Sequence, residues 1–157
     1  MNDPRDENRS APSPTQPTLR HLDVRPILAR GTDPLEEILA ALDPLPPGSA
    51  FHVLAPFRPN PLLDLLAERG HRTDVAELGP AWSVTVLVGG GGWYRDLRNL
   101  PPPEPMEAVL AATVDGGPFL ARLPRHPRLL EDQLRRRARR WEVLALEDGS
   151  ALLWVAP

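Results

Sequence analysis

The residues of this chain that could do chemistry are its histidines, two acid–arginine pairs and a run of arginines. The histidines are His21, His52, His71 and His126, and none has the HxH or HExxH spacing typical of a metal site. The 157 residues include no cysteine and no lysine, which excludes thiolate, disulfide, Schiff-base and P-loop lysine chemistry. No serine lies in a GxSxG sequence. We therefore predict no catalytic residue and no metal ligand, and the sequence favours a protein that is not an enzyme.

Two acid–arginine pairs, Asp23 with Arg25 and Asp96 with Arg98, recur near the start of each half of the chain. Each pair follows a predicted strand and precedes a helix, whose N-terminus favours anions. The arginines are thus candidates for holding a small carboxylate or phosphate, and the alternative is an ion pair that ties strand to helix. The predicted ligand-binding residues are Arg25, Arg98, Glu104 and His126, although a helix cap also accounts for Glu104.

An arginine-rich segment near the C-terminal end forms a local charge asymmetry, although the formal net charge of the whole chain is −3. Arginine forks bind phosphates and carboxylates, so the segment predicts an anion or partner patch. A solvated helix face is the alternative interpretation. Among aromatic residues only Trp141 adjoins these arginines, so nucleic-acid binding is the lesser possibility. The predicted patch comprises Arg122, Arg125, Arg128, Arg135, Arg136 and Arg139.

A run of glycines at 89–92 separates two halves that carry similar features in the same order. Asp-Pro-Leu-Glu at 33–36 and Glu-Pro-Met-Glu at 104–107 each open an apolar stripe with helical spacing. The proline suits the first helical turn, and the following glutamate can reach back to the cap. Each half continues with an apolar strand, a second leucine-rich helix and two strands joined by a turn.

This order predicts an α/β two-layer sandwich (α+β) with two tandem β-α-β-α-β-β repeats, each a four-stranded mixed sheet covered by two helices. The second helices are expected at 62–69 and 128–139, and the closing strands at 73–78, 82–88, 141–146 and 151–155. The expected domains are a disordered proline-rich tail at 1–20, a first repeat at 21–88, a glycine linker at 89–92 and a second repeat at 93–157. One repeat is small for independent stability, so we expect an intramolecular pseudo-dimer.

Several phrases resemble the uncharacterised DUF2249 family. They are Leu-Asp-Val-Arg at 22–25, Asp-Pro-Leu-Pro-Pro-Gly at 43–48, Leu-Ala-Glu-Arg-Gly at 66–70 and Asp-Leu-Arg-Asn-Leu-Pro-Pro-Pro at 96–103. The resemblance covers residues 22–157 and implies a fold similar to the TusA-type (SirA-like) sulfur carriers. In those carriers a Cys-Pro-x-Pro motif opens the first helix. Pro102 stands at the cysteine position here, so the resemblance supports the fold and argues against sulfur transfer.

The resemblance also bears on a site before the second helix, where members of the family often have a His-Asp pair. This chain has Phe57-Arg58 there in the first half and Pro124-Arg125, with His126 nearby, in the second. The pair is thus largely lost. Members of the family resemble hemerythrin-like and respiratory or nitrogen-oxide proteins in gene context, and this resemblance implies an accessory role in redox metabolism.

Together these features predict a non-catalytic binding or adaptor protein that docks a protein partner or a small anionic ligand, without a cofactor. Two alternatives stay open: a metal- or haem-linked redox accessory protein that uses His126, and an anion- or RNA-binding module that uses the arginine-rich second repeat. The chain has no apolar run of about 18–20 residues and no signal segment, which predicts a cytoplasmic protein without membrane contact. We expect the chain to be a monomer or a homodimer.

Overall fold

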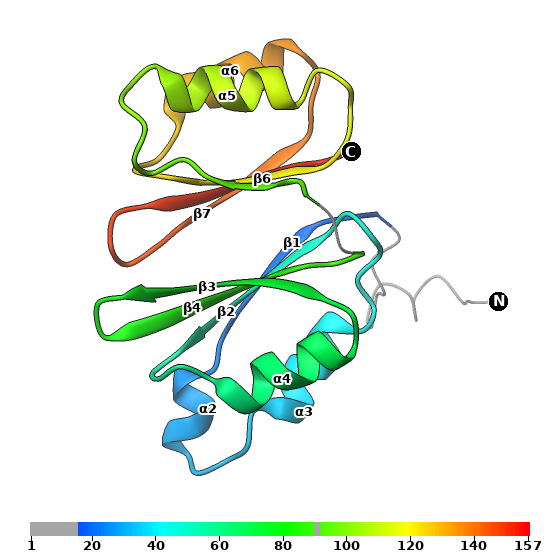
Figure 1. Cartoon of the computed structure of the whole chain (residues 1–157), viewed down its shortest axis with the longest axis vertical. Helices are drawn as coiled ribbons and strands as arrows, with labels where there is room; N and C mark the ends of the chain where they lie inside the picture. The colour runs from blue at the N-terminus through cyan, green and yellow to red at the C-terminus, as the bar shows by residue number, and fades with distance from the viewer. Residues whose placement is uncertain (1–15, 90–91) are drawn as a thin grey trace, which may run out of the picture.

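The computed structural model describes residues 16–89 and 92–157, which form two units with the same order of strands (Figure 1). The first unit comprises β1 (Leu19–Asp23), α2 (Arg25–Ala29), α3 (Leu35–Leu42), β2 (Ala50–Ala55), α4 (Asn60–Glu68), β3 (Arg72–Leu78) and β4 (Ala81–Leu87). The second comprises β5 (Tyr94–Asp96), α5 (Glu104–Ala112), β6 (Phe119–Leu123), α6 (Arg128–Arg136), β7 (Trp141–Ala145) and β8 (Ala151–Val155). The predicted fold class is confirmed, and the short helix α2 is an addition to it.

Each unit has one four-stranded mixed sheet, with strand orders β1-β2-β4-β3 and β5-β6-β8-β7. The first two strands of each sheet run parallel, and the remaining pairs are antiparallel. Parallel neighbours require a crossover connection, which α2 and α3 provide in the first unit and α5 in the second. The crossover therefore places the start of the first long helix beside the carboxyl ends of two parallel strands.

The two sheets face each other, and the helices cover their outer faces, so the molecule has four layers (Figure 1). The alternation of side chains along β2 shows how one strand serves two layers. Phe51 and Val53 point to the helices of their own unit, whereas Ala50 and Leu54 join a cluster shared with the second sheet. Every residue of β2 is consequently buried.

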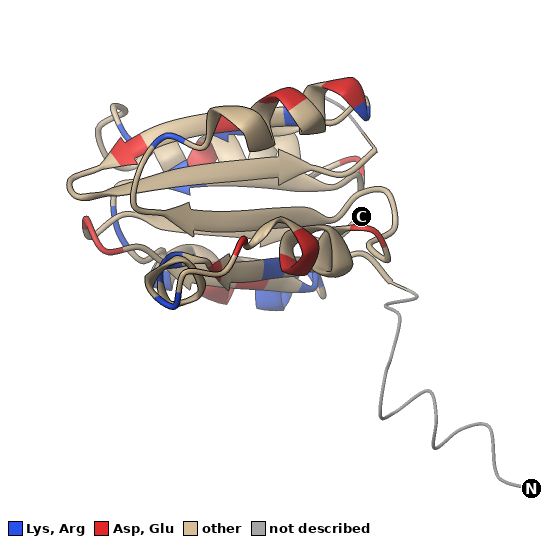
Figure 2. Ribbon diagram, turned by 90° about the horizontal axis from the view of Figure 1, so that it is seen from below, with Lys and Arg blue, Asp and Glu red and all other residues tan. Residues whose placement is uncertain are grey.

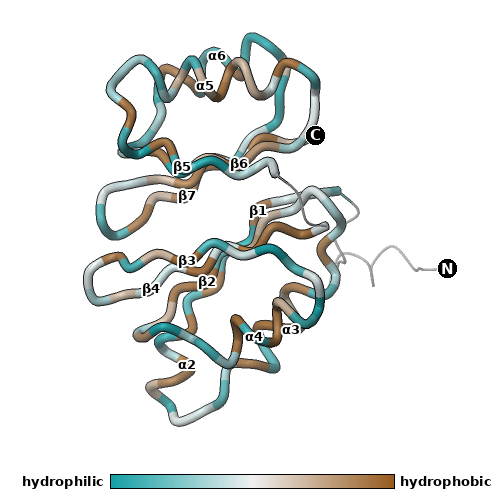
Figure 3. The backbone as a smooth tube through the Cα atoms, viewed as in Figure 1, coloured by the Kyte–Doolittle hydropathy of each residue, from teal (hydrophilic) through white to brown (hydrophobic). Residues whose placement is uncertain are grey.

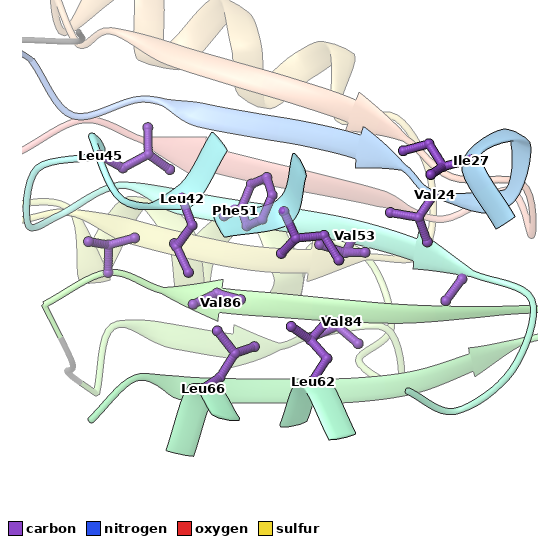
Figure 4. Packing of buried hydrophobic residues seen from close by; sticks show 13 residues of the cluster. Val24, Ile27, Leu42, Leu45, Phe51, Val53, Leu62, Leu66, Val84 and Val86 are labelled. Atoms are coloured by element: carbon purple, nitrogen blue, oxygen red, sulfur yellow. The ribbon is translucent and has the colours of Figure 1, made fainter. Parts of the chain in front are cut away.

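The helix-facing core of the first unit packs leucines from the helices against the sheet (Figure 4). Leu42 of α3 and Leu62 and Leu66 of α4 lie over Phe51 and Val84 of the strands. The second unit has a corresponding core, which includes Val109, Phe119, Leu130, Leu134 and Leu153.

A third buried cluster lies between the sheets and takes residues from both units. Leu54 and Leu87 of the first unit pack with Leu120, Leu152 and Trp154 of the second. Trp154 also donates a hydrogen bond from Nε1 to the carbonyl oxygen of Gly48 at 2.9 Å. The two sheets thus bury apolar area against each other, which makes the packing of each unit depend on the other.

Helix ends differ from the predicted bounds by a few residues for local reasons. Helix α3 begins at Leu35, and the Asp33 carboxylate accepts a hydrogen bond from the Leu35 amide at 2.9 Å. Asp33 thus caps the helix from one position further out than expected. Helix α6 ends at Arg136 rather than at 139, because Ala138 takes a left-handed φ of 56° that stops the helix.

Strand β1 begins inside the segment that the sequence assigned to the tail. Leu19 and Arg20 pair with β2, and the Thr18 hydroxyl donates a hydrogen bond to Glu142 of the second unit at 2.8 Å. Residues 1–15 of the predicted tail and Gly90-Gly91 of the predicted linker lie outside the described residues.

Charge and hydropathy follow the four layers. Figure 2 shows that acidic and basic residues gather on helices and loops, whereas the strands are mostly uncharged. Figure 3 shows hydrophobic stretches along the strands and along the inner sides of the helices. In the part of the chain that the structure describes, no helix combines the length and the apolar character needed to cross a bilayer.

Candidate binding site

The second unit has a pocket of about 560 Å³ between the start of α5 and the loop that leads from β6 into α6. Its walls come mainly from apolar side chains and prolines. Leu123 and Leu130 form the buried part, and Leu129 stands at the mouth with 73% of its surface exposed. The lining residues are Pro102, Pro103, Pro105, Met106, Leu123, Pro124, Arg125, His126, Pro127, Arg128, Leu129 and Leu130.

Prolines give this pocket its shape. Pro103 and Pro127 are the residues before α5 and α6, and neither helix has a side-chain hydrogen bond at its cap. Proline fixes φ and has no amide hydrogen, so these segments turn sharply without backbone donors to satisfy. The walls of the pocket are consequently rigid segments of the chain whose side chains are mostly apolar.

Arginines stand at the mouth of the pocket. Arg125 and Arg128 are exposed, and neither forms an ion pair with residues 16–89 or 92–157. His126 is occupied, because its Nε2 lies 2.8 Å from the Glu131 carboxylate. Burial opposes ionisation of Glu131, but hydrogen bonds from Trp141 and His126 outweigh it and lower the pKa of this carboxyl. The free charges that line the pocket are therefore positive.

Of the predicted ligand-binding residues His126 and Glu104, the structure places only His126 in the pocket lining. His126 lines the pocket, whereas Glu104 is an exposed residue in the first turn of α5 and is not part of the lining. His126 and Glu131 together offer two potential metal ligands. Residues 16–89 and 92–157 hold no group of three or more histidines or carboxylates that could bind a metal ion.

A smaller pocket of about 280 Å³ occupies the corresponding place in the first unit, between the start of α3 and the loop before α4. The loop is Pro-Phe-Arg-Pro at 56–59 and corresponds to Pro-Arg-His-Pro at 124–127. Pro59 and Pro127 share nearly the same conformation, with φ −84° and ψ 71° in one and φ −91° and ψ 66° in the other. Phe57 stands at the mouth with 54% of its surface exposed. Asp33 is the one charged residue among the described lining.

The acid–arginine pairs form ion pairs, and their residues are not among those that line either pocket. The Arg25 guanidinium contacts Asp23 at 2.8 Å and Glu147 of the β7–β8 turn at 2.7 Å. Hydrogen bonds to these two carboxylates raise the pKa of Arg25. Arg98 contacts Asp96 at 2.8 Å. A ligand at either arginine would have to compete with these carboxylates, so ligand binding there stays a prediction.

The structure disperses the predicted arginine patch. Arg135 pairs with Asp132 at 2.8 Å. Arg139 donates to the carbonyl oxygens of Thr113 and Ala156, so it ties the end of α6 to neighbouring segments. Arg136 is exposed. Anion binding by the remaining exposed arginines stays a prediction.

Arg122 lies apart from the other arginines, because it points from β6 into the space between the sheets and is fully buried. Its Nη2 donates to Oγ of Ser83 at 2.9 Å, and Oγ of Ser83 lies 2.6 Å from Nε2 of His52. The His52 ring contacts His21 in turn, with 3.0 Å between their Nδ1 atoms. A chain of polar groups therefore runs from edge strand β1 through β2 and β4 to the second sheet.

Sequence reasoning missed this polar chain, although a signal for it exists. His52 and Ser83 stand on alternating positions of their strands with residues that face the other sheet. Burial, followed by the nearby His21 and Arg122, lowers the pKa of His52 to about 3. Nη1 of Arg122 and Oγ1 of Thr85 are buried without a hydrogen-bond partner in the described part of the chain.

Ser83 and His52 have the spacing of a nucleophile and its base, but their burial argues against catalysis. Both residues have 0% of their surface exposed, so no substrate reaches the Ser83 hydroxyl in this arrangement. The polar chain joins the two sheets, and the open pockets are the places where an external molecule can bind.

The fold and the pockets define a class of protein: two α/β units, each with a proline-walled pocket at the starts of its two long helices. Residues 21–88 match the family model of DUF2249, described as an uncharacterized conserved protein. This match supports the assignment of the first unit to that family. No curated protein and no solved structure matches the chain.

Proposed function

We propose that this chain is a non-catalytic binding module, built as a tandem pair of DUF2249-type units, whose second unit holds a segment of a partner protein. The observation that carries the proposal is the apolar pocket of about 560 Å³ with exposed Leu129 at its mouth. A leucine with 73% of its surface exposed gains free energy when a partner covers it. The pocket is therefore a docking site rather than a reaction site.

The tandem arrangement is supported by corresponding features of the two units. Their sheets share one strand order, and the Pro-x-x-Pro loops at 56–59 and 124–127 both lead into a helix with buried leucines. Pro102 lines the second pocket at the position that the sulfur-carrier likeness gives to a cysteine. A proline cannot carry a persulfide, but at this position it can contact a bound partner segment.

A peptide segment suits the shape of the pocket better than a small molecule does. Small-molecule sites enclose most of their ligand. Here Pro102, Pro103, Pro124 and Leu129 are themselves exposed around the mouth. An extended segment can place one apolar side chain in the pocket and cover this rim with its neighbours.

Two other functions predicted from the sequence find less support. A metal or haem bound through Nε2 of His126 would compete with the Glu131 carboxylate, which leaves Nδ1 as the one ligand atom of this ring without that competition. RNA binding would need a continuous basic surface, whereas Arg135 and Arg139 are engaged with Asp132 and with backbone carbonyls. Both remain alternatives to the binding module.

The proposal is tested with a displayed library of random 12-residue peptides, selected against the full chain. Enriched peptides should bind with dissociation constants in the micromolar range and lose most of that affinity in the variant Leu129→Ser. Val114→Ser is the matched control, because Val114 is 71% exposed but lies outside the pocket lining. Selection of no binding peptide, or binding that Leu129→Ser leaves unchanged, would contradict the proposal.

A further inference from the structure

The two pockets carry opposite charge although they occupy corresponding places. The charged residue in the first pocket is Asp33, whereas the second is lined by Arg125, Arg128 and His126. The Asp33 carboxylate is already engaged as an acceptor for the Leu35 amide. The difference in charge therefore comes mainly from the two arginines of the second pocket, because Phe57 and Asn60 stand at their positions in the first loop. Arg58 of that loop is exposed, contacts Asn60 and is not among the residues that line the first pocket.

The arginines of the second pocket are available to a ligand. Both are exposed and form no ion pair within the described part of the chain, unlike Arg25, Arg98 and Arg135, which each contact a carboxylate. No carboxylate is among the residues that line the pocket. Two unpaired guanidinium groups beside an apolar pocket are complementary to an apolar side chain flanked by carboxylates.

We infer that the partner segment for the second unit is acidic: an apolar side chain enters the pocket, and neighbouring aspartate or glutamate residues contact Arg125 and Arg128. This inference rests on the proposed function and adds the chemistry of its partner. The apolar lining supplies most of the affinity, and the arginines supply selectivity and faster association. The first pocket, which has no arginine in its lining, does not share this preference.

Two synthetic peptides test the inference by differing in charge alone. They are acetyl-Glu-Glu-Leu-Leu-Glu-Glu-amide and its counterpart with glutamine at every glutamate. Each is titrated into the full chain while the methyl resonances of Met106, Leu123 and Leu130 are followed by NMR. The acidic peptide should bind about three- to tenfold more tightly at low salt, and the difference should shrink as salt is added.

The double variant Arg125→Gln/Arg128→Gln should bind both peptides equally. Arg136→Gln is the matched control, because Arg136 is exposed on the same helix but does not line the pocket, and it should keep the preference. A preference that survives the double variant, or equal binding of both peptides by the unaltered chain, would overturn the inference and leave the proposed function intact. Failure of both peptides to shift the pocket methyls, together with a failed library selection, would overturn both.

The same titration separates a peptide from a small carboxylate. 4-Phenylbutyrate offers an apolar arm and one carboxylate without a peptide backbone. If it shifts the pocket methyls at lower concentration than the acidic peptide, the site is a small-molecule site and the inferred partner is wrong. Weaker binding than the peptide is the expected result.

Discussion

The rings of His21 and His52 stack at the edge of the first sheet, with 5.2 Å between their centroids and 3.0 Å between their Nδ1 atoms. Arg122 donates to Ser83, so Ser83 can donate its proton to His52, and His52 can donate to His21. This direction of hydrogen bonding satisfies every link while both imidazoles are neutral. This arrangement of the polar chain therefore holds while both histidines are uncharged.

We expect acid to destabilise the protein through this pair of histidines. Burial lowers the pKa of both, to about 3 for His52, whereas the unfolded chain binds protons near 6.5. The unfolded state thus holds more protons between these values, so the free energy of unfolding falls as pH decreases below 6.5. His52 alone contributes a slope of about 1.4 kcal/mol per pH unit across that window. Urea unfolding at pH 7, 6 and 5 measures the slope.

The variant His52→Gln removes this titration and should flatten the slope. His71→Gln is the control, because His71 lies outside the buried polar chain and should leave the slope largely in place. An unchanged slope in His52→Gln would show that other groups cause the acid sensitivity. Carboxyl groups such as Asp23, whose pKa is lowered mainly by the Arg25 hydrogen bond, add to the loss only near pH 4 and below.

Arg122 should tolerate an apolar replacement of similar length better than truncation. Its guanidinium is fully buried, donates to Ser83 and retains an unpaired Nη1, so its desolvation is only partly compensated. We expect Arg122→Met to change the free energy of unfolding by about 1 kcal/mol or less. Arg122→Ala also leaves a cavity and should cost about 3 kcal/mol. Equal losses in the two variants would show that the buried charge itself stabilises the sheets.

Helical spacing and turn residues were sufficient to predict the order of elements, because they act locally. The stripe begun by Leu35 formed as predicted, and the helix opened by Pro61 and expected at 62–69 formed at Asn60–Glu68, two residues earlier at its start. Helix α2 was missed, since Arg25–Ala29 is a single short turn too brief for a periodic signal. The end of α6 was missed because the left-handed turn at Ala138 has no glycine to mark it.

The candidate site was predicted in part, because it depends on contacts between segments far apart in the chain. His126, Arg125 and Arg128 follow one another in sequence, and the structure brings them to one pocket. Arg122 looked like a neighbour of these arginines, but the alternation of strand β6 turns it to the opposite face of the sheet. Its partner Ser83 is 39 residues away. No local spacing could have paired them.

The two units should lose structure together when either core is damaged. Leu66 and Leu134 are fully buried in the helix-facing cores, and the cluster between the sheets couples those cores. Leu66→Ala should cost about 3 kcal/mol. In mild urea, hydrogen exchange measured by mass spectrometry should then accelerate in β8 as well as in β2. Leu134→Ala is the reciprocal test, and exchange that accelerates in one unit alone would show that the units unfold separately.

A glycine at the end of the first unit should be harder to replace than one in a hairpin turn. Gly89 and Gly79 have left-handed φ values of 88° and 68°, so alanine strains the backbone at either position. A Cβ at Gly89 would lie 2.8 Å from Cβ of Pro47, whereas nothing lies within 4 Å of one at Gly79. We expect Gly79→Ala to lower the free energy of unfolding by about 1 kcal/mol and Gly89→Ala by about twice that. Equal losses in urea unfolding would mean that Pro47 moves aside and that this approach of the two segments does not constrain the fold.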